Sequence, residues 1–186
     1  TQTYSISVMG EPAENYVSIA LHDRLRGNAY KVWAVASAVA FVWLALIVLP
    51  PVLAGNGAGN AASPLYSFFS HICHQLPERS FFIFGHKLAV CSRCFGVYFG
   101  LLAGLLTYPL WRSIDNIDPL PRLWLFASMV PIAIDWSLTI FGIWENTFVS
   151  RSITGLILGF ACGVYILPAL VEIFRHLFYS GNRASA

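Results

Sequence analysis

Three cysteines and a histidine within one short stretch could bind a metal ion. Cys73 and His74 are adjacent, and Cys91 and Cys94 follow in a C-x-x-C motif, CSRC. Thiolate and imidazole are the ligands that close a tetrahedral zinc site, and three cysteines with one histidine fill such a site completely. The sequence therefore predicts a site for zinc or another transition metal, formed by Cys73, His74, Cys91 and Cys94.

The imidazole of this site has alternatives. Neighbouring residues such as Cys73 and His74 can bind the same metal only where the backbone turns tightly. His71 lies two residues before Cys73 and could replace His74, and His86 is a weaker substitute. The identity of the fourth ligand therefore stays open.

The cysteines could also form a disulfide. Disulfides persist in an oxidising extracytoplasmic compartment, so a Cys91–Cys94 or Cys73–Cys91 pair without metal is the alternative. Three cysteines would then leave one thiol unpaired. Cys162 lies in an apolar segment far along the chain, and we interpret it as a small packing residue.

The composition indicates that membrane-spanning helices carry these residues. Of the 186 residues, 57% are hydrophobic and 11% are charged, compared with roughly 25% charged in a soluble domain. The mean hydropathy is +0.65. The net charge of +2 comes without a basic run, which argues against nucleic-acid binding. We find no G-x-S-x-G, H-E-x-x-H, P-loop or dinucleotide motif, so the sequence leaves open whether the protein is an enzyme.

Four apolar segments have the length of about 20 residues that a bilayer crossing needs. They cover approximately residues 32–54, 91–111, 121–143 and 151–174. We therefore predict an all-α integral membrane protein with four transmembrane helices and a Cys/His-containing extracytoplasmic loop. The chain divides into an N-terminal cytoplasmic or interfacial segment (1–30), a four-span membrane domain (31–175) and a C-terminal tail (176–186).

The segments around the first span have their own signals. Apolar residues at near-helical spacing predict a short amphipathic helix on the membrane surface over residues 16–26. An ordered tail that rests on the protein itself is the alternative. Pro50 and Pro51 should bend or stop the first span. The sequence GNGAGNAAS at 55–63 is typical of a flexible linker. For residues 64–90 we expect a short helix and a turn at the interface.

The distribution of basic residues predicts the orientation. The termini and the loop after the second span hold seven Lys and Arg residues, and the opposite side holds four. Because cytoplasmic loops carry more Lys and Arg, both termini should be cytoplasmic and the cysteine-rich loop outside. We expect a multi-pass protein of the prokaryotic cell (inner) membrane.

Charged residues at membrane depth form a second candidate site. Asp135 lies within the third span, and a lone carboxylate there is costly, so it should have a partner or a function. A structural ion pair with Arg93 or Arg151 is one interpretation, and a role in substrate binding or proton transfer is the other. The predicted cluster at the outer side consists of Arg79, Arg93, Asp135, Glu145 and Arg151.

Glycines recur every four residues in two spans. The second span contains Gly96, Gly100 and Gly104, and the fourth contains Gly155, Gly159 and Gly163. Small residues on one helix face let two backbones approach closely in lipid. The spacing therefore predicts that the second and fourth spans pack against each other.

Several of these motifs resemble those of a prokaryotic membrane family known as domain of unknown function 2085. The resemblance covers about residues 67–167 and rests on a C-H-Q-x-P-x-R-S block, a C-x-R-C-x-G block and the later Asp and Arg. In this sequence the matching positions are Cys73, His74, Gln75, Pro77, Arg79, Ser80, Cys91, Arg93, Cys94, Gly96, Asp135, Arg151, Thr154 and Gly155. It implies that Cys73 and His74, in preference to His71, belong to the motif, and it implies no activity.

Three functional hypotheses follow. The first is a small non-catalytic membrane subunit of a larger complex with a structural metal site at the outer membrane face. The second is a thiol–disulfide or electron-transfer protein that uses Cys91 and Cys94. The third is a metal-dependent membrane enzyme acting on a lipid or another anionic interfacial substrate. The expected partners are membrane lipids and other membrane-protein subunits, without nucleic acid, and a bound lipid is a further candidate ligand.

Overall fold

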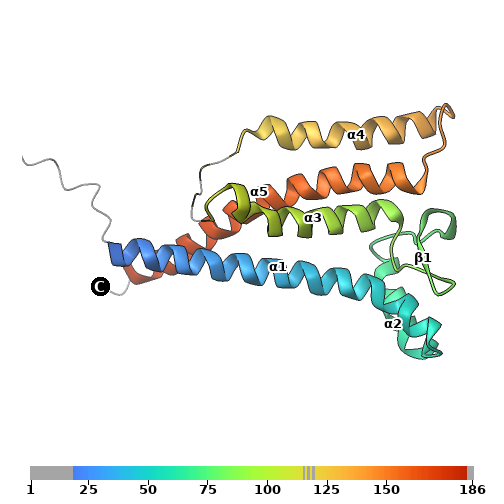
Figure 1. Cartoon of the computed structure of the whole chain (residues 1–186), viewed down its shortest axis with the longest axis horizontal. Coiled ribbons are helices and arrows are strands. Elements are labelled where there is room, and N and C mark those ends of the chain that lie inside the picture. Colours follow the sequence, from blue (N-terminus) through green and yellow to red (C-terminus); the bar gives the residue numbers. More distant parts are fainter. Residues whose placement is uncertain (1–18, 115, 117, 119, 184–186) are drawn as a thin grey trace, which may run out of the picture.

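Four long helices run alongside one another in the computed structural model, which describes residues 19–114, 116, 118 and 120–183 (Figure 1). They are α1 (Ile19–Gly55), α3 (Ser92–Trp111), α4 (Arg122–Ile140) and α5 (Phe148–Arg183). Each contains a stretch long and apolar enough to cross a bilayer. The prediction of an all-α membrane protein with four spans is confirmed.

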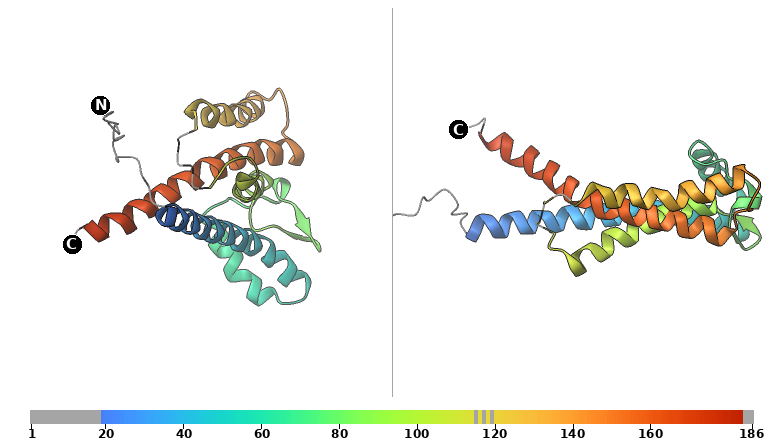
Figure 2. Two further views of the ribbon diagram at one scale, coloured as in Figure 1. Left: turned by 60° about the vertical axis from the view of Figure 1, so that its left-hand side comes forward. Right: turned by 90° about the horizontal axis from the view of Figure 1, so that it is seen from above.

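Short elements gather at one end of the bundle, between α1 and α3. They are α2 (Gly59–Ser70), the 3-10 helix η2 (Pro77–Arg79) and the strands β1 (Phe82–Ile83) and β2 (His86–Lys87), which pair as an antiparallel hairpin. The start of α1 and the end of α5 lie at the opposite end (Figures 1 and 2). Both ends of the described chain are therefore far from the cysteine-rich segment.

Pro50 and Pro51 lie inside α1 without stopping it, because the helix continues through both to Gly55, one residue beyond the predicted end of the first span. A proline at position 51 cannot donate a hydrogen bond to the carbonyl four residues earlier, which belongs to Ile47. The backbone N–H of Ala89 donates to that carbonyl instead, with an N–O distance of 3.4 Å. The segment before α3 therefore satisfies an acceptor that the proline leaves open.

Three element boundaries also differ from the expectations. The predicted linker 55–63 is a linker only up to Ala58, because α2 begins at Gly59. The last helix continues to Arg183, so residues 176–183 extend α5 instead of forming a separate tail. Residues 16–18 of the expected surface helix lie outside the described part, and residues 19–26 continue directly into α1.

The contact between α3 and α5 is the most extensive in the bundle. The glycines of the two helices face the partner backbone: a Cβ atom on any of them would come closer than 3.0 Å to a carbonyl oxygen of the other helix. The carbonyls belong to Ser152, Leu156 and Phe160 for the α3 glycines, and to Arg93, Val97 and Leu101 for the α5 glycines. Backbone approach at this distance requires that no side chain intervene.

The third span, α4, packs mainly on α5, and most of its side chains are exposed. Its C-terminal end is a Schellman motif, with Gly142 in the left-handed region at φ +67°. The N–H of Ile143 donates to the Leu138 carbonyl (3.1 Å), and the N–H of Gly142 donates to the Thr139 carbonyl (3.2 Å). This turn directs the following loop back toward the helix that it has just left.

The α3–α5 contact predicts that one added methyl group at the helix interface destabilises the protein. Replacing Gly159 by Ala should lower the free energy of unfolding by about 1–3 kcal/mol, because the new Cβ must push the two backbones apart. Denaturation in mixed detergent micelles measures this value. The matched control is Gly27→Ala on α1, where a Cβ has no neighbour within 4 Å and should leave stability unchanged or raised. Equal stability of the two variants would contradict the close contact.

Candidate metal centre and the adjacent ion pair

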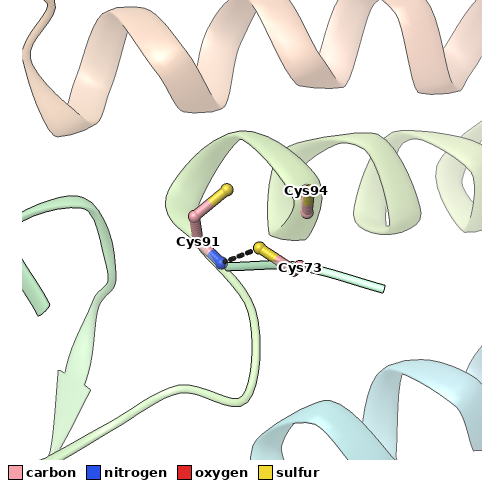
Figure 3. A group of neighbouring side chains, drawn as sticks. All are labelled: Cys73, Cys91 and Cys94. Carbon is pink, nitrogen blue, oxygen red and sulfur yellow. Dashed lines mark hydrogen bonds between the residues drawn. The ribbon is translucent and has the colours of Figure 1, made fainter. Parts of the chain in front are cut away.

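Three thiols converge where the cysteine-rich segment meets the first turn of α3 (Figure 3). The Sγ atoms of Cys73, Cys91 and Cys94 all lie within 4.8 Å of one another. Cys73 is buried, and the other two are half-buried. Cys91 is the N-cap residue of α3 and Cys94 lies in its first turn, while Cys73 comes from the segment after α2. None of these cysteines is in a disulfide.

Backbone N–H groups point at the sulfur of Cys73. The N–H of Cys91 donates to Cys73 Sγ with an N–S distance of 3.3 Å, and the nearby backbone N–H of Gln75 contributes to lowering the pKa of the Cys73 thiol. Gln75 has φ +48°, a conformation that non-glycine residues rarely adopt. Hydrogen bonding with the thiols of Cys91 and then Cys94 lowers the pKa of the Cys73 thiol. The surroundings of this sulfur thus favour a thiolate.

A closed set of hydrogen bonds holds the Cys73 segment in place. Gln75 is buried, and its side-chain amide donates to the Tyr66 carbonyl (2.8 Å). The Gln75 carbonyl accepts from the ammonium of Lys87 (2.8 Å), and the Lys87 carbonyl accepts from the Tyr66 hydroxyl. These bonds link α2, the turn at residue 75 and β2. The turn that aims Gln75 N–H at the sulfur is therefore supported on both sides.

The structure does not bring a histidine into the sulfur group. His74 is exposed, and the group of metal-ligand atoms within 4.8 Å contains only the three sulfurs among the described residues. His71 is also exposed, with Nδ1 2.8 Å from the Ser67 carbonyl oxygen, and His86 is an exposed residue of β2. Cys162 lies half-buried in α5, outside the group.

An ion pair lies on the same end of the bundle. The guanidinium of Arg93, in the first turn of α3, pairs with the carboxylate of Asp135 on α4, whose side chain is 8% exposed. The side-chain amide of Asn146 donates to Asp135 Oδ2 (2.6 Å) and to the Asp135 carbonyl (3.0 Å). Thr139 also contacts Asn146 through its hydroxyl. The carboxylate is therefore charge-paired and hydrogen-bonded at membrane depth.

The other predicted charges take different positions. Arg151, half-buried at the start of α5, interacts electrostatically with Arg79, Arg93 and Asp135, and one of its N–H groups lies 3.5 Å from Asn146 Oδ1. Glu145 is exposed and forms no ion pair with any residue that the structure describes. Arg151 therefore lies near two other arginines and a single carboxylate, that of Asp135.

Sequence reasoning missed the residues that support these sites. Asn146 follows the predicted Glu145 directly, but an amide in a polar loop carries no signal for a bond to a carboxylate eleven residues away. Tyr66 and Lys87 are equally unremarkable in the sequence, because their roles depend on hydrogen bonds to backbone carbonyls. Only Gln75 had a signal, namely its place in the C-H-Q block.

The fold and the site define the class: a helical integral membrane protein with a three-cysteine group at one end of its bundle. The chain belongs to the family described as "Predicted membrane protein (DUF2085)", whose model matches residues 73–165. The matched region begins at Cys73 and extends beyond Asp135 and Arg151, so it includes the cysteine group and the ion pair.

Two archaeal proteins are similar to this chain. An uncharacterized protein from Methanocaldococcus jannaschii is 45% identical over 115 residues, which are 61% of this chain and 73% of the relative. An uncharacterized protein from Methanothermobacter thermautotrophicus is 34% identical over 111 residues, 59% of this chain and 92% of the relative. No solved structure matches the chain.

The ion pair predicts a large effect of removing the carboxylate. Asp135→Ala should lower the free energy of unfolding by about 3–5 kcal/mol, because Arg93 would remain in a poorly solvated position without its partner. Denaturation in detergent micelles measures this value. The control Glu145→Ala removes an exposed carboxylate and should change stability by no more than about 0.5 kcal/mol. Wild-type stability of Asp135→Ala would show that the pair is not structural.

Proposed function

We propose that this protein is a small non-catalytic membrane subunit in which Cys73, Cys91 and Cys94 bind a zinc ion, or another transition metal, as a structural centre. The convergence of three sulfurs from two separate segments carries the proposal. Two zinc–sulfur bonds of about 2.3 Å at a tetrahedral angle place sulfurs about 3.8 Å apart. Sulfurs already within 4.8 Å need only small movements to reach that spacing.

The surroundings of the sulfurs support thiolate ligands. Metal-bound thiolates are stabilised by hydrogen bonds from neighbouring groups, and Cys73 Sγ accepts the backbone N–H of Cys91. Cys91 and Cys94 lie at the N-terminus of α3, where the helix dipole favours negative charge. Apolar residues surround the group, with Ile47, Phe69 and Val90 fully buried beside it. This donor set fits a soft or borderline metal ion.

The fourth ligand distinguishes a structural from a catalytic centre. His74 follows Cys73 directly and is exposed, so its side chain is free to change rotamer and could complete a closed site. A water molecule in the fourth position would instead leave the site open for chemistry. We propose His74 as the fourth ligand, because a closed Cys3His site agrees with the lack of any recognised catalytic motif in the sequence.

A metal ion here would join elements that already contact one another through hydrogen bonds and a small buried apolar cluster. It would connect the segment after α2 to the first turn of α3, and hence to the α3–α5 pair. Binding free energies of structural zinc sites in peptides are on the order of 10–16 kcal/mol and act as folding free energy. We therefore infer that the metal stabilises the loop end of the bundle, which the excess of basic residues at the opposite end assigns to the outer membrane face.

The exposed surface of α4 supports the assignment as a subunit. Only Ser128 and Asp135 are buried in this helix, and Trp124, Phe126 and Trp136 are each at least 59% exposed. Lipid can cover such a surface, but so can a helix of another membrane protein. Gentle detergent extraction should therefore recover this chain with other membrane-protein subunits, and recovery as an isolated chain under these conditions would contradict the subunit role.

A second candidate function has its own observation. Near Cys91, Arg151 interacts electrostatically with Arg79 and Arg93, and with a single carboxylate, that of Asp135. In addition, Arg93 Nε is buried without a hydrogen-bond partner among the described residues. A metal with an open coordination position beside such a cluster would suit a metal-dependent enzyme acting on an anionic interfacial substrate.

Metal analysis of the purified protein tests the proposal. We expect one zinc or other transition-metal ion per chain, and loss of most of it in Cys73→Ser, Cys91→Ser or Cys94→Ser. Cys162→Ser is the matched control and should retain the metal, because Cys162 lies outside the group. Little metal in the wild type together with a Cys91–Cys94 disulfide would contradict the proposal and favour thiol–disulfide or electron-transfer chemistry.

X-ray absorption spectroscopy of the metal-loaded protein separates the two candidates. Three sulfur ligands and one nitrogen, with the nitrogen lost in His74→Ala, support the structural centre. Three sulfur ligands and one oxygen from water, unchanged in His74→Ala, contradict the closed site and favour the enzyme.

A further inference from the structure

A groove runs along the membrane-spanning part of the bundle, between α1, α3 and α5. Its volume is 660 Å³, and apart from Lys31 at one end its lining is formed by apolar and aromatic side chains. Val35 and Val39 of α1, Leu101 of α3 and Leu170 of α5 lie along its length. The groove is thus an apolar surface groove that lies within the predicted spans.

The two ends of the groove differ in chemistry. Trp43 and Tyr98 line the end of the groove that is farther from Lys31, and their ring centroids lie 5.8 Å apart in an edge-to-face arrangement. Trp43 also packs on Phe69, with ring centroids 5.5 Å apart. These rings form an aromatic floor. Lys31 lies at the other end, toward the start of α1, and is exposed. It makes no ion pair with any residue in the described part of the chain.

The distance between these ends matches one leaflet of a bilayer. Lys31 and Trp43 are about twelve residues apart on α1, which corresponds to about 18 Å at 1.5 Å per residue. The hydrocarbon core is about 30 Å thick, so one leaflet contributes about 15 Å of acyl chain. A chain that began at the level of Lys31 would therefore reach the aromatic floor near the middle of the membrane.

The residues next to Lys31 indicate that it lies at the membrane–water interface. Tyr30 and Trp33 flank it, and their rings contact each other edge-to-face at 6.3 Å. Trp and Tyr are enriched at this level of membrane proteins. Trp33 is fixed there, because its indole N–H donates to the Leu105 carbonyl on α3 (2.8 Å). A lysine at this depth places its ammonium among lipid head groups.

We propose that the groove binds one acyl chain of an anionic phospholipid from the leaflet at the end where α1 begins, with the phosphate at Lys31. An apolar groove within the hydrocarbon region fits a hydrocarbon chain, and the single cation at its interfacial end selects a negatively charged head group. The aromatic floor limits the chain to one leaflet. This inference goes beyond the proposed function and does not require a metal at the cysteine group.

Native mass spectrometry of the full-length protein in detergent, titrated with phosphatidylglycerol or phosphatidylcholine, tests the proposal. We expect tighter binding of phosphatidylglycerol by about fivefold, the effect of one lysine near an anionic head group. Lys31→Gln should abolish this preference and leave phosphatidylcholine binding unchanged. The matched control Arg122→Gln removes an exposed cation from the same end of the bundle, outside the groove, and should keep the preference.

A second pair of variants tests the groove itself. Val39→Trp would fill the groove and should weaken binding of both lipids. Val42→Trp adds the same volume at an exposed position of α1 outside the groove and should leave binding unchanged. Both positions are more than half exposed, so both variants should fold. Equal binding of the two lipids by the wild type, or equal behaviour of the two tryptophan variants, would overturn the proposal. Co-purification of a neutral isoprenoid, or of another protein's helix, in the groove would also overturn it.

Discussion

Backbone contact between α3 and α5 is the constraint on which the rest of the structure depends. At each of six glycines the partner's carbonyl oxygen occupies the space that a side chain would need. In lipid there is no hydrophobic force that drives two apolar helices together, so close van der Waals contact has to supply the attraction. The pairing also brings the first turns of the two helices together. Arg93, near Cys91, and Arg151 therefore lie at one end of the same helix pair.

This arrangement brings two positive charges together, and a third helix, α4, supplies a negative charge beside them. Two arginines at neighbouring helix ends repel each other, and Asp135 of α4 supplies the compensating charge. The carboxylate in turn depends on Asn146, which the turn at Gly142 directs back toward it. Because α4 buries few other side chains, its position relies on this polar contact. Separating the two charges would leave each of them uncompensated in a poorly solvated position, so the pair favours the one arrangement of α3 and α4 that keeps them together.

The cysteine group and the groove between α1, α3 and α5 have one side chain in common. Trp43 packs against the cluster that contains Cys73 and also lines the end of the groove that is farther from Lys31. The sulfur of Cys73 accepts the backbone N–H of Cys91, and hydrogen bonds through Gln75 hold the Cys73 segment, whereas the groove is formed by the spans alone.

The sequence by itself determined the number of spans, since hydropathy and length depend only on consecutive residues, and it determined which residue types the site contains. It also carried the four-residue glycine spacing. Tertiary structure alone decided that the three sulfurs meet while the His74 side chain is exposed, and that Asn146 and not Glu145 holds Asp135. It also decided which group bonds to the Ile47 carbonyl that Pro51 leaves open. Each of these outcomes depends on hydrogen bonds or packing between segments far apart in the chain, such as Ala89 N–H donating to a carbonyl of α1. A local sequence pattern cannot predict such contacts, because the two groups become neighbours only once the chain has folded.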